Sequence, residues 1–216
     1  MNTFSGKRTV ILISGEGTNL QILIDQAKDQ SLPIDIVGVV SNQAEANGLN
    51  RATAAGINHF VVDEKQFPAT DDFDAELKNV VDELSPDMII LAGFMRILAT
   101  DFVNQYLGKI INIHPSLLPK YRGLHTHQRV VEAGDSVHGA SVHFVIPELD
   151  CGPSIIQSTI TVNEDDTAET LAKKVHAEEH KILPIATTWL ALGKIKLEDT
   201  QIYCEGKLLK EPVQLN

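Results

Sequence analysis

Short apolar runs alternate with amphipathic segments through the first half of the chain. The runs predict five strands, at residues 9–13, 34–40, 59–62, 88–92 and 109–113. The segments between them space their apolar residues as helices do, most clearly from Phe73 to Leu84. Strands that are apolar throughout and separated by helices are typical of a parallel sheet covered on both faces. We therefore predict an α/β fold, doubly wound, with a mostly parallel sheet and helices on both faces.

The pattern changes after residue 114. A loop rich in Pro, Gly and His leads to two longer runs, residues 137–146 and 155–162, which predict antiparallel strands. Asp166 to Glu169 resembles a capping box that opens a long helix. Residues 195–209 alternate around a Glu-Gly pair and predict a terminal hairpin. The C-terminal portion is thus predicted to be antiparallel, and without a linker or repeat we expect one domain over residues 1–216.

The composition and charge of the chain argue against some classes of binding partner. The 18 basic and 29 acidic residues give a net charge of −11, which argues against nucleic-acid or anionic-membrane partners. The N-terminal apolar run is too short for a signal peptide, and no run approaches the roughly 18 residues of a membrane span. Cys151 and Cys204 lie far apart, with neither metal nor redox spacing. We predict a soluble, cytoplasmic protein that binds small molecules, and a homodimer is compatible with the sequence.

The segment from Ser14 to Asn19 lies where a strand is followed by a helix. Glycines there let backbone N–H groups approach an anion, and the helix N-terminus adds favourable partial charge. The segment Ser-Gly-Glu-Gly-Thr-Asn matches neither the Walker pattern nor GxGxxG. Two interpretations stay open at this point, a phosphate site and an ordinary tight turn.

Asn112 and His114 end the fifth apolar run. Strand alternation places both side chains on one face, at the carboxyl edge of the sheet where ligands bind in such folds. A strand-end histidine held by backbone is the structural alternative. Asp150 matters if the chain returns it to His114, where it would hold the imidazole; otherwise it is a solvated turn residue.

The histidines around residues 114–127 raise the question of a metal site. His125 and His127 lack an accompanying Cys pair or HExxH pattern, so we predict that they brace their loop and that no metal is bound. Cys151 lacks a partner arrangement for a nucleophile.

Four segments, taken in order, carry a family resemblance. They are residues 13–21 (ISGEGTNLQ), 91–98 (LAGFMRIL), 112–123 (NIHPSLLPKYRG) and the stretch from His138-Gly139 to Asp150-Cys-Gly152. These segments closely resemble the phosphoribosylglycinamide formyltransferases, a folate-dependent branch of the formyltransferase family. The likeness extends over nearly the whole chain.

The resemblance implies transfer of a formyl group from 10-formyltetrahydrofolate to the amine of glycinamide ribonucleotide, in purine biosynthesis. It implies a phosphate- and nucleotide-binding half at about residues 1–113 and a folate-binding, catalytic-loop half at about 114–216. It also implies residue roles. These are catalysis by Asn112, His114 and Asp150; substrate binding by Gly17, Thr18, Asn19 and Glu179; and folate binding by Met95, Arg96, Ile97, Leu98, Asn112, Ile146 and Asp150.

Two residues depart from the family pattern. Cys151 stands where Gly is common, and Thr70 stands where some members have a folate-contacting Arg, so Thr70 is left out of the predicted site. The rival functions are a deformylase, a methionyl-tRNA formyltransferase and a non-catalytic metabolite sensor. The first two are expected to need an additional domain or a basic RNA-facing surface, and a sensor need not keep all three catalytic residues.

Overall fold

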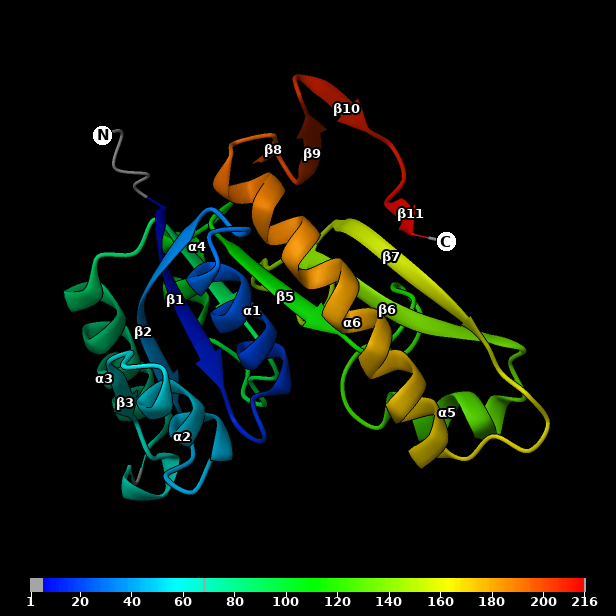
Figure 1. The fold of residues 1–216 in the computed structure, drawn as a ribbon, viewed down its shortest axis with the longest axis horizontal. Helices are drawn as coiled ribbons and strands as arrows, with labels where there is room; N and C mark the ends of the chain where they lie inside the picture. The colour runs from blue at the N-terminus through cyan, green and yellow to red at the C-terminus, as the bar shows by residue number, and fades with distance from the viewer. Residues whose placement is uncertain (1–5, 68, 216) are drawn as a thin grey trace. The chain divides into compact units, whose positions relative to one another are not determined.

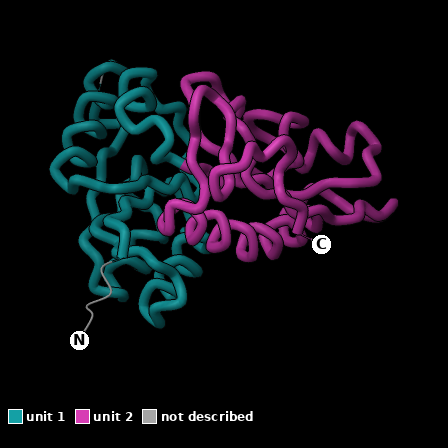
Figure 2. The backbone as a smooth tube through the Cα atoms, turned by 90° about the horizontal axis from the view of Figure 1, so that it is seen from above, with its two compact units in different colours: residues 1–110 teal, residues 111–216 magenta. Residues whose placement is uncertain are grey.

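The computed structural model describes residues 6–67 and 69–215. Its internal contacts divide the chain into two compact units, residues 1–110 and 111–216 (Figure 2). Each unit is described by itself. Whether the chain acts as one domain stays a prediction.

The first unit alternates parallel strands with helices (Figure 1). Its strands lie in the order β4-β1-β2-β3, and β1 pairs in parallel with both β2 and β4. The elements are β1 (Lys7–Ile13), α1 (Thr18–Lys28), β2 (Ile34–Ser41), α2 (Asn47–Ala54), β3 (His59–Val61), the 3-10 turn η1 (Glu64–Gln66), α3 (Thr70–Leu84), β4 (Met88–Leu91) and α4 (Thr100–Gln105).

The strand order places helices on both faces of this unit. The chain moves outward from β1 to β2 and β3, and then returns past β1 to form β4. Because parallel crossovers are right-handed, α1 and α2 cover one face and α3 covers the other. The direction reverses between β1 and β4, so the carboxyl ends of these two strands form the crevice where doubly wound folds bind ligands. The predicted doubly wound architecture is confirmed.

Apolar burial explains why these segments form strands and helices. Residues 10–13 of β1 and residues 89–90 of β4 are fully buried, as central strands covered on both faces must be. Helix α3 buries Phe73, Leu77 and Val81, one residue per turn, which confirms the predicted apolar stripe.

The second unit is mainly antiparallel. Strand β5 pairs antiparallel with β6, and β6 with β7, while the short β11 runs parallel to β7. A separate three-stranded antiparallel sheet has the order β10-β9-β8. The elements are β5 (Ile110–His114), which begins at the unit boundary, α5 (Thr126–Ala133), β6 (Val137–Phe144), β7 (Ser154–Thr161), α6 (Ala168–Ala191), β8 (Ile195–Glu198), β9 (Gln201–Cys204), β10 (Lys207–Leu209) and β11 (Val213–Leu215).

One local prediction in this unit was wrong, and another was incomplete. The capping box at α6 is formed by Thr167 and Thr170, each side chain bonding the other's backbone N–H, because Thr167 has the extended backbone of an N-cap. The predicted terminal hairpin around Glu205 and Gly206 is confirmed, because β9 and β10 pair antiparallel across these residues. A third strand, β8, joins it because the chain also reverses at Asp199 and Thr200, which have φ values of 47° and 67°. Two consecutive positive φ values fit a tight hairpin turn.

Candidate active site

Strand β5 brings Asn112 and His114 to one face, as predicted. Its antiparallel partner β6 places His143 opposite Asn112 and Ser141 opposite His114. Directly opposed residues of antiparallel strands have neighbouring side chains. Asp150 follows β6 in a connecting segment and has a left-handed φ of 49°. The cluster in the second unit therefore contains the three predicted residues and one histidine that the sequence interpretation left out.

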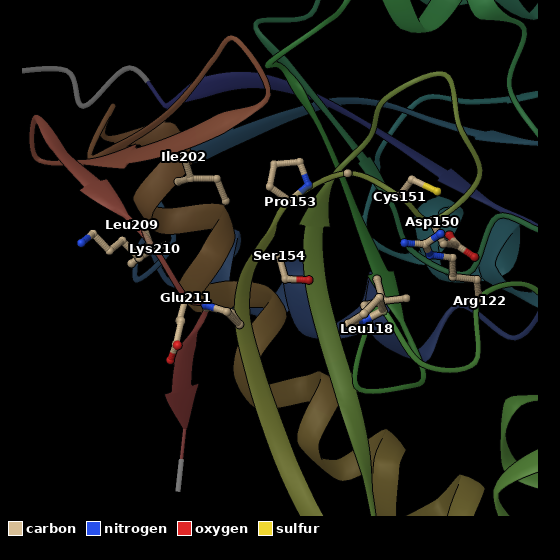
Figure 3. Close-up of a pocket in the computed structure, with 13 residues that line it drawn as sticks. Leu118, Arg122, Asp150, Cys151, Pro153, Ser154, Ile202, Leu209, Lys210 and Glu211 are labelled. Carbon is tan, nitrogen blue, oxygen red and sulfur yellow. The ribbon is translucent and has the colours of Figure 1, made fainter.

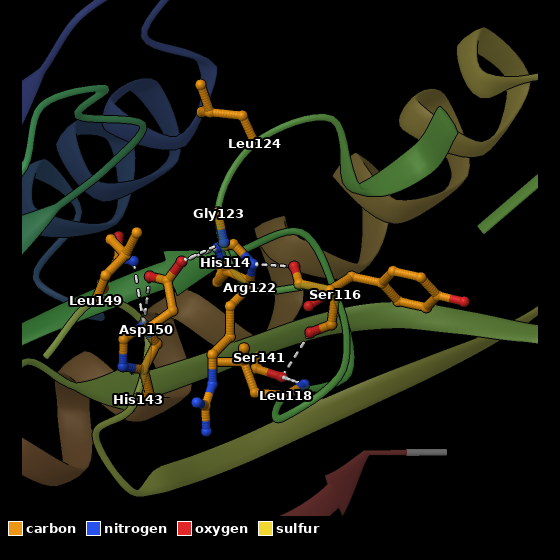
Figure 4. A network of polar contacts seen from close by, with 12 residues as sticks. His114, Ser116, Leu118, Arg122, Gly123, Leu124, Ser141, His143, Leu149 and Asp150 are labelled. Atoms are coloured by element: carbon orange, nitrogen blue, oxygen red, sulfur yellow. Dashed lines mark hydrogen bonds and ion pairs between the residues drawn. The ribbon is translucent and has the colours of Figure 1, made fainter. Parts of the chain in front are cut away.

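His114 lies between two acceptors (Figure 4). Its Nε2 is 2.9 Å from the carbonyl oxygen of Tyr121, and its Nδ1 is 3.5 Å from Oδ2 of Asp150. A carbonyl oxygen only accepts, so Nε2 carries a proton. Nδ1 faces the carboxylate, so the ring lies between a carbonyl oxygen and a carboxylate oxygen. The same Oδ2 accepts a 2.8 Å hydrogen bond from the backbone N–H of Gly123.

The His143 ring is neutral. Its Nδ1 donates to the carbonyl oxygen of Phe144 at 2.8 Å, and burial lowers its pKa to about 4. The neutral ring therefore presents the lone pair of Nε2, which accepts from Nδ2 of Asn112 at 3.1 Å. Asp150 Oδ1 lies 3.7 Å from the same nitrogen, but a neutral ring forms no ion pair with it. His143 thus fixes the direction of the Asn112 amide, which keeps a second N–H for another acceptor.

The segment from Pro115 to His125 is held by side chains on both sides. Ser141 Oγ donates to the Ser116 carbonyl at 2.6 Å and accepts from Leu118 N–H at 3.1 Å. The Tyr121 hydroxyl donates to Asp135 at 2.8 Å, and the Arg129 guanidinium bonds the Arg122 carbonyl at 2.6 Å. These anchors fix the Tyr121 carbonyl and the Gly123 N–H, the two backbone groups that contact His114 and Asp150.

The bracing role predicted for His127 is visible in its contacts. Its Nδ1 lies 2.9 Å from Nε2 of His138 on β6. Burial lowers the pKa of both rings, that of His138 to about 4, so the pair is neutral at neutral pH and one ring donates to the other. His125 is the N-cap residue of α5, with a φ of 58°.

A pocket of about 280 Å³ borders Asp150 within the second unit (Figure 3). In the close-up Asp150, Arg122 and Cys151 lie together at one end, and the segment from Leu209 to Glu211 lies at the other. This volume is ample for water molecules, so water can reach the neighbourhood of the carboxylate. Both cysteines, Cys151 and Cys204, are free thiols.

The predicted phosphate segment is closely packed in the first unit. Gly17, the N-cap residue of α1, has a φ of 70°, and a Cβ there would lie 2.6 Å from the Cα of Gly48. Gly48 N–H donates to the Gly15 carbonyl at 3.0 Å, and Arg51 Nε donates to the Glu16 carbonyl at 2.7 Å. Helix α2 thus holds a left-handed turn directly before Thr18 and Asn19, the first residues of α1, where the helix N-terminus carries a partial positive charge.

The other predicted residues are divided between the two units. In the segment after β4, Met95 and Ile97 are 66% and 63% exposed, whereas Leu98 is buried. Ile146 is half-buried, two residues beyond the end of β6. Glu179 lies buried on α6, with its Oε2 3.8 Å from Nδ1 of His176. The roles assigned to these residues stay predictions.

The described residues bear on two further classes of site. Within residues 6–67 and 69–215, no three His, Cys, Asp or Glu side chains are grouped so as to hold a metal ion. Among the helices of that same part of the chain, none combines the length and apolar character needed to cross a membrane.

Comparisons with known proteins agree on one family of enzymes. The family model described as formyl transferase matches residues 7–187. Phosphoribosylglycinamide formyltransferase of Escherichia coli K12 is 44% identical over 200 residues, covering 93% of this chain and 94% of that protein. The bovine trifunctional purine biosynthetic protein adenosine-3 is 43% identical over 91% of this chain, which corresponds to 20% of its own length. The solved Coxiella burnetii phosphoribosylglycinamide formyltransferase, in complex with CHES, is 45% identical with a TM-score of 0.91, over 98% of this chain and all of that one.

Proposed function

The chain belongs to the formyl transferase family, and from that premise we propose that it transfers a formyl group from 10-formyltetrahydrofolate to the amine of glycinamide ribonucleotide. The products are the N-formyl ribonucleotide and tetrahydrofolate, and the step belongs to purine biosynthesis. The observation that carries the proposal is the cluster of Asn112, His114 and Asp150, whose donors and carboxylate suit acyl transfer to an amine.

The chemical demand is to stabilise negative charge on the formyl oxygen as the amine adds to the formyl carbon. Asn112 supplies an amide N–H whose direction His143 fixes. His114, protonated between Tyr121 and Asp150, supplies a positive charge beside it. Preoriented donors of this kind are among the largest contributions to acyl-transfer catalysis.

The amine must also lose a proton after it adds to the formyl carbon. Asp150 is the carboxylate in this cluster, and the pocket beside it admits water. We assign Asp150 two tasks, which are holding His114 protonated and accepting the amine's proton through water. The same proton is passed on to the folate nitrogen as its bond to the formyl carbon breaks, so that tetrahydrofolate leaves with an N–H. The attacking nucleophile is the substrate's own amine, so the step uses no nucleophilic side chain of the enzyme.

Features of the first unit support binding of the two substrates. The Gly17 turn leads into the N-terminus of α1, whose partial positive charge suits the ribonucleotide phosphate. The exposed apolar side chains of Met95 and Ile97 suit the planar ring of a folate. Two residues of the second unit are assigned by the family resemblance, Glu179 to the ribose of the ribonucleotide and Ile146 to the folate.

The proposal is tested with Asn112→Ala and Asp150→Ala. Removing an oxyanion donor or the carboxylate is expected to lower kcat by about 10²-fold or more, while the Kd for glycinamide ribonucleotide changes little. Formation of tetrahydrofolate gives kcat, and calorimetric titration gives the Kd. Asn104→Ala and Asp165→Ala, at exposed positions, serve as matched controls.

Three results would reject the proposal. A near-normal kcat in either variant removes the residue from catalysis. Equal release of formate with and without glycinamide ribonucleotide would instead identify a deformylase. Stabilisation by both ligands with zero turnover in the unaltered protein would identify a sensor.

A further inference from the structure

A hydrogen-bonded chain joins the two loops of the first unit that the proposed function assigns to different substrates. We call residues 14–19 the phosphate loop and residues 93–98 the donor loop. The Ser14 hydroxyl accepts from the backbone N–H of Met95 at 2.7 Å and donates to Oδ1 of Asn42 at 2.6 Å. Ser14 N–H also donates to the Gly93 carbonyl at 3.0 Å. Because Ser14 has one hydroxyl proton and donates it to Asn42, its hydroxyl oxygen is the acceptor in the bond with the Met95 N–H.

The hydrogen-bonded chain continues from Asn42 to Glu64. Its side chain follows β2 and is 1% exposed, and its Nδ2 donates to Oε2 of Glu64 at 3.2 Å. The other carboxylate oxygen, Oε1, accepts from Gln43 Nε2 at 2.7 Å. A buried amide with both ends bonded has little freedom to turn, so Asn42 is a rigid link.

Glu64 closes a ring of contacts by holding Arg96 of the donor loop. Arg96 Nη1 lies 3.3 Å from Oε2 of Glu64, and its guanidinium carbon lies 3.9 Å from the centre of the Phe73 ring. Arg96 Nε is also 3.9 Å from Oδ1 of Asp74, a carboxyl whose pKa burial raises above its usual value. The side chain is only 22% exposed, although both neighbours, Met95 and Ile97, point to solvent.

This arrangement has a physical consequence for the donor loop. Met95 and Ile97 are two large apolar side chains exposed to water, and burying them against the protein would lower the free energy. Anchoring the residue between them, at both its side chain and the preceding N–H, opposes that collapse. Glu64 is the group that connects the two anchors.

We propose that Glu64 is a positioning residue, which holds the donor loop open for the formyl donor and ties it to the phosphate loop through Asn42 and Ser14. The assignment of the donor loop rests on the proposed function. The restraint of residues 93–98 by Glu64 follows from the contacts alone.

The first test needs no substrate. Hydrogen–deuterium exchange of the ligand-free protein is compared for the unaltered chain, Glu64→Ala, Glu64→Gln and the control Glu45→Ala. Glu45 is an exposed glutamate whose ion pair with Lys65 spans 3.8 Å, with a side chain 77% exposed. We expect amide exchange in residues 93–98 to accelerate by roughly three- to tenfold in Glu64→Ala and to stay unchanged in Glu45→Ala.

The second test separates positioning from general damage. Glu64→Ala is expected to raise the KM for 10-formyltetrahydrofolate by roughly three- to tenfold, and to change kcat and the KM for glycinamide ribonucleotide less than about twofold. Glu64→Gln keeps one acceptor oxygen without the charge, so its effect should be smaller. If Glu64→Ala does not fold, Glu64→Gln carries both tests.

The outcomes are distinct from those of the proposed function. Unaltered exchange in residues 93–98, or equal acceleration in Glu45→Ala, overturns the role of Glu64 whatever the enzyme catalyses. A kcat loss with unchanged donor KM overturns it as well. If the unaltered protein shows no formyl transfer, the proposed function is rejected. The hydrogen–deuterium exchange of residues 93–98 then still tests the role of Glu64.

Discussion

At the residue scale, two histidines on neighbouring strands have different chemical roles because their surroundings differ. His114 has an acceptor beside each ring nitrogen, the Tyr121 carbonyl at Nε2 and the Asp150 carboxylate at Nδ1. His143 donates to a carbonyl from Nδ1, and burial lowers its pKa to about 4, so it stays neutral and accepts from Asn112. Placing similar side chains in different environments is a common way to divide donor and acceptor tasks within a site.

The role of His143 can be tested directly. In His143→Leu the Asn112 amide loses its acceptor and can turn its oxygen toward the substrate, which would repel the developing charge. We expect kcat to fall by about tenfold or more with both KM values within about twofold. His143→Gln, whose side-chain oxygen can accept from Asn112, should recover part of the loss. Steady-state kinetics with each substrate varied in turn measures kcat and both KM values. A kcat of His143→Leu equal to that of the unaltered enzyme would contradict the role of His143.

At the element scale, the turn between β1 and α1 depends on two glycines in contact. A Cβ on Gly17 would lie 2.6 Å from Gly48 Cα, and a Cβ on Gly48 would lie 2.4 Å from Ile13 Cδ1. Glycine is therefore required by space as well as by the left-handed backbone at Gly17. The close approach of α2 to this turn is what holds the N-terminus of α1 in place.

Gly17→Ala and Gly56→Ala make a matched pair for this element. Both glycines have left-handed backbones, with φ values of 70° and 71°, but a Cβ on Gly56 would have no atom within 4 Å among those described. The backbone strain of each substitution is about 1–2 kcal/mol. We expect Gly17→Ala to lower stability further, and to raise the KM for glycinamide ribonucleotide by about tenfold, whereas Gly56→Ala leaves that KM unchanged. Urea unfolding and kinetics measure both effects; equal behaviour of the two variants would refute the packing argument.

At the scale of the whole molecule, buried histidines make stability depend on pH. Burial lowers the pKa of both His138 and His143 from 6.5 to about 4. His138 faces His127, Asp135 and His114, and His143 faces Asp150 and His114. Between pH 6.5 and 4 the unfolded chain binds protons that the folded protein excludes. Stability from these groups is therefore complete above pH 6.5 and is lost as the pH falls.

We expect the free energy of unfolding to drop between pH 7.5 and 5 by about 1–2 kcal/mol for each of these histidines. Urea unfolding across this range measures the slope. His138→Asn lowers stability overall but should flatten the slope, whereas His59→Asn, at an exposed position on β3, should leave it unchanged. A slope that is identical in His138→Asn and the unaltered protein would show that His138 does not carry the effect. Cytoplasmic location and a homodimer stay predictions at this scale.

The sequence alone determined those features that depend on short-range periodicity. Continuous apolar runs specify buried parallel strands, helical spacing specifies the stripe on α3, and a two-residue period places Asn112 and His114 on one face. The family motifs added the chemistry, including Asp150. These inferences succeed because the neighbours that decide them lie within a few residues along the chain.

Tertiary structure alone decided the contacts that make the cluster. His143 meets Asn112 only through the register of β5 with β6, and Asp150 meets His114 only because its segment folds back with a left-handed φ. Glu64 reaches Arg96 and Asn42 across three separate segments. Local patterns carry no signal for such meetings, because the free energy that brings distant residues together comes from burying the core, and side chains at its edge are placed as a consequence.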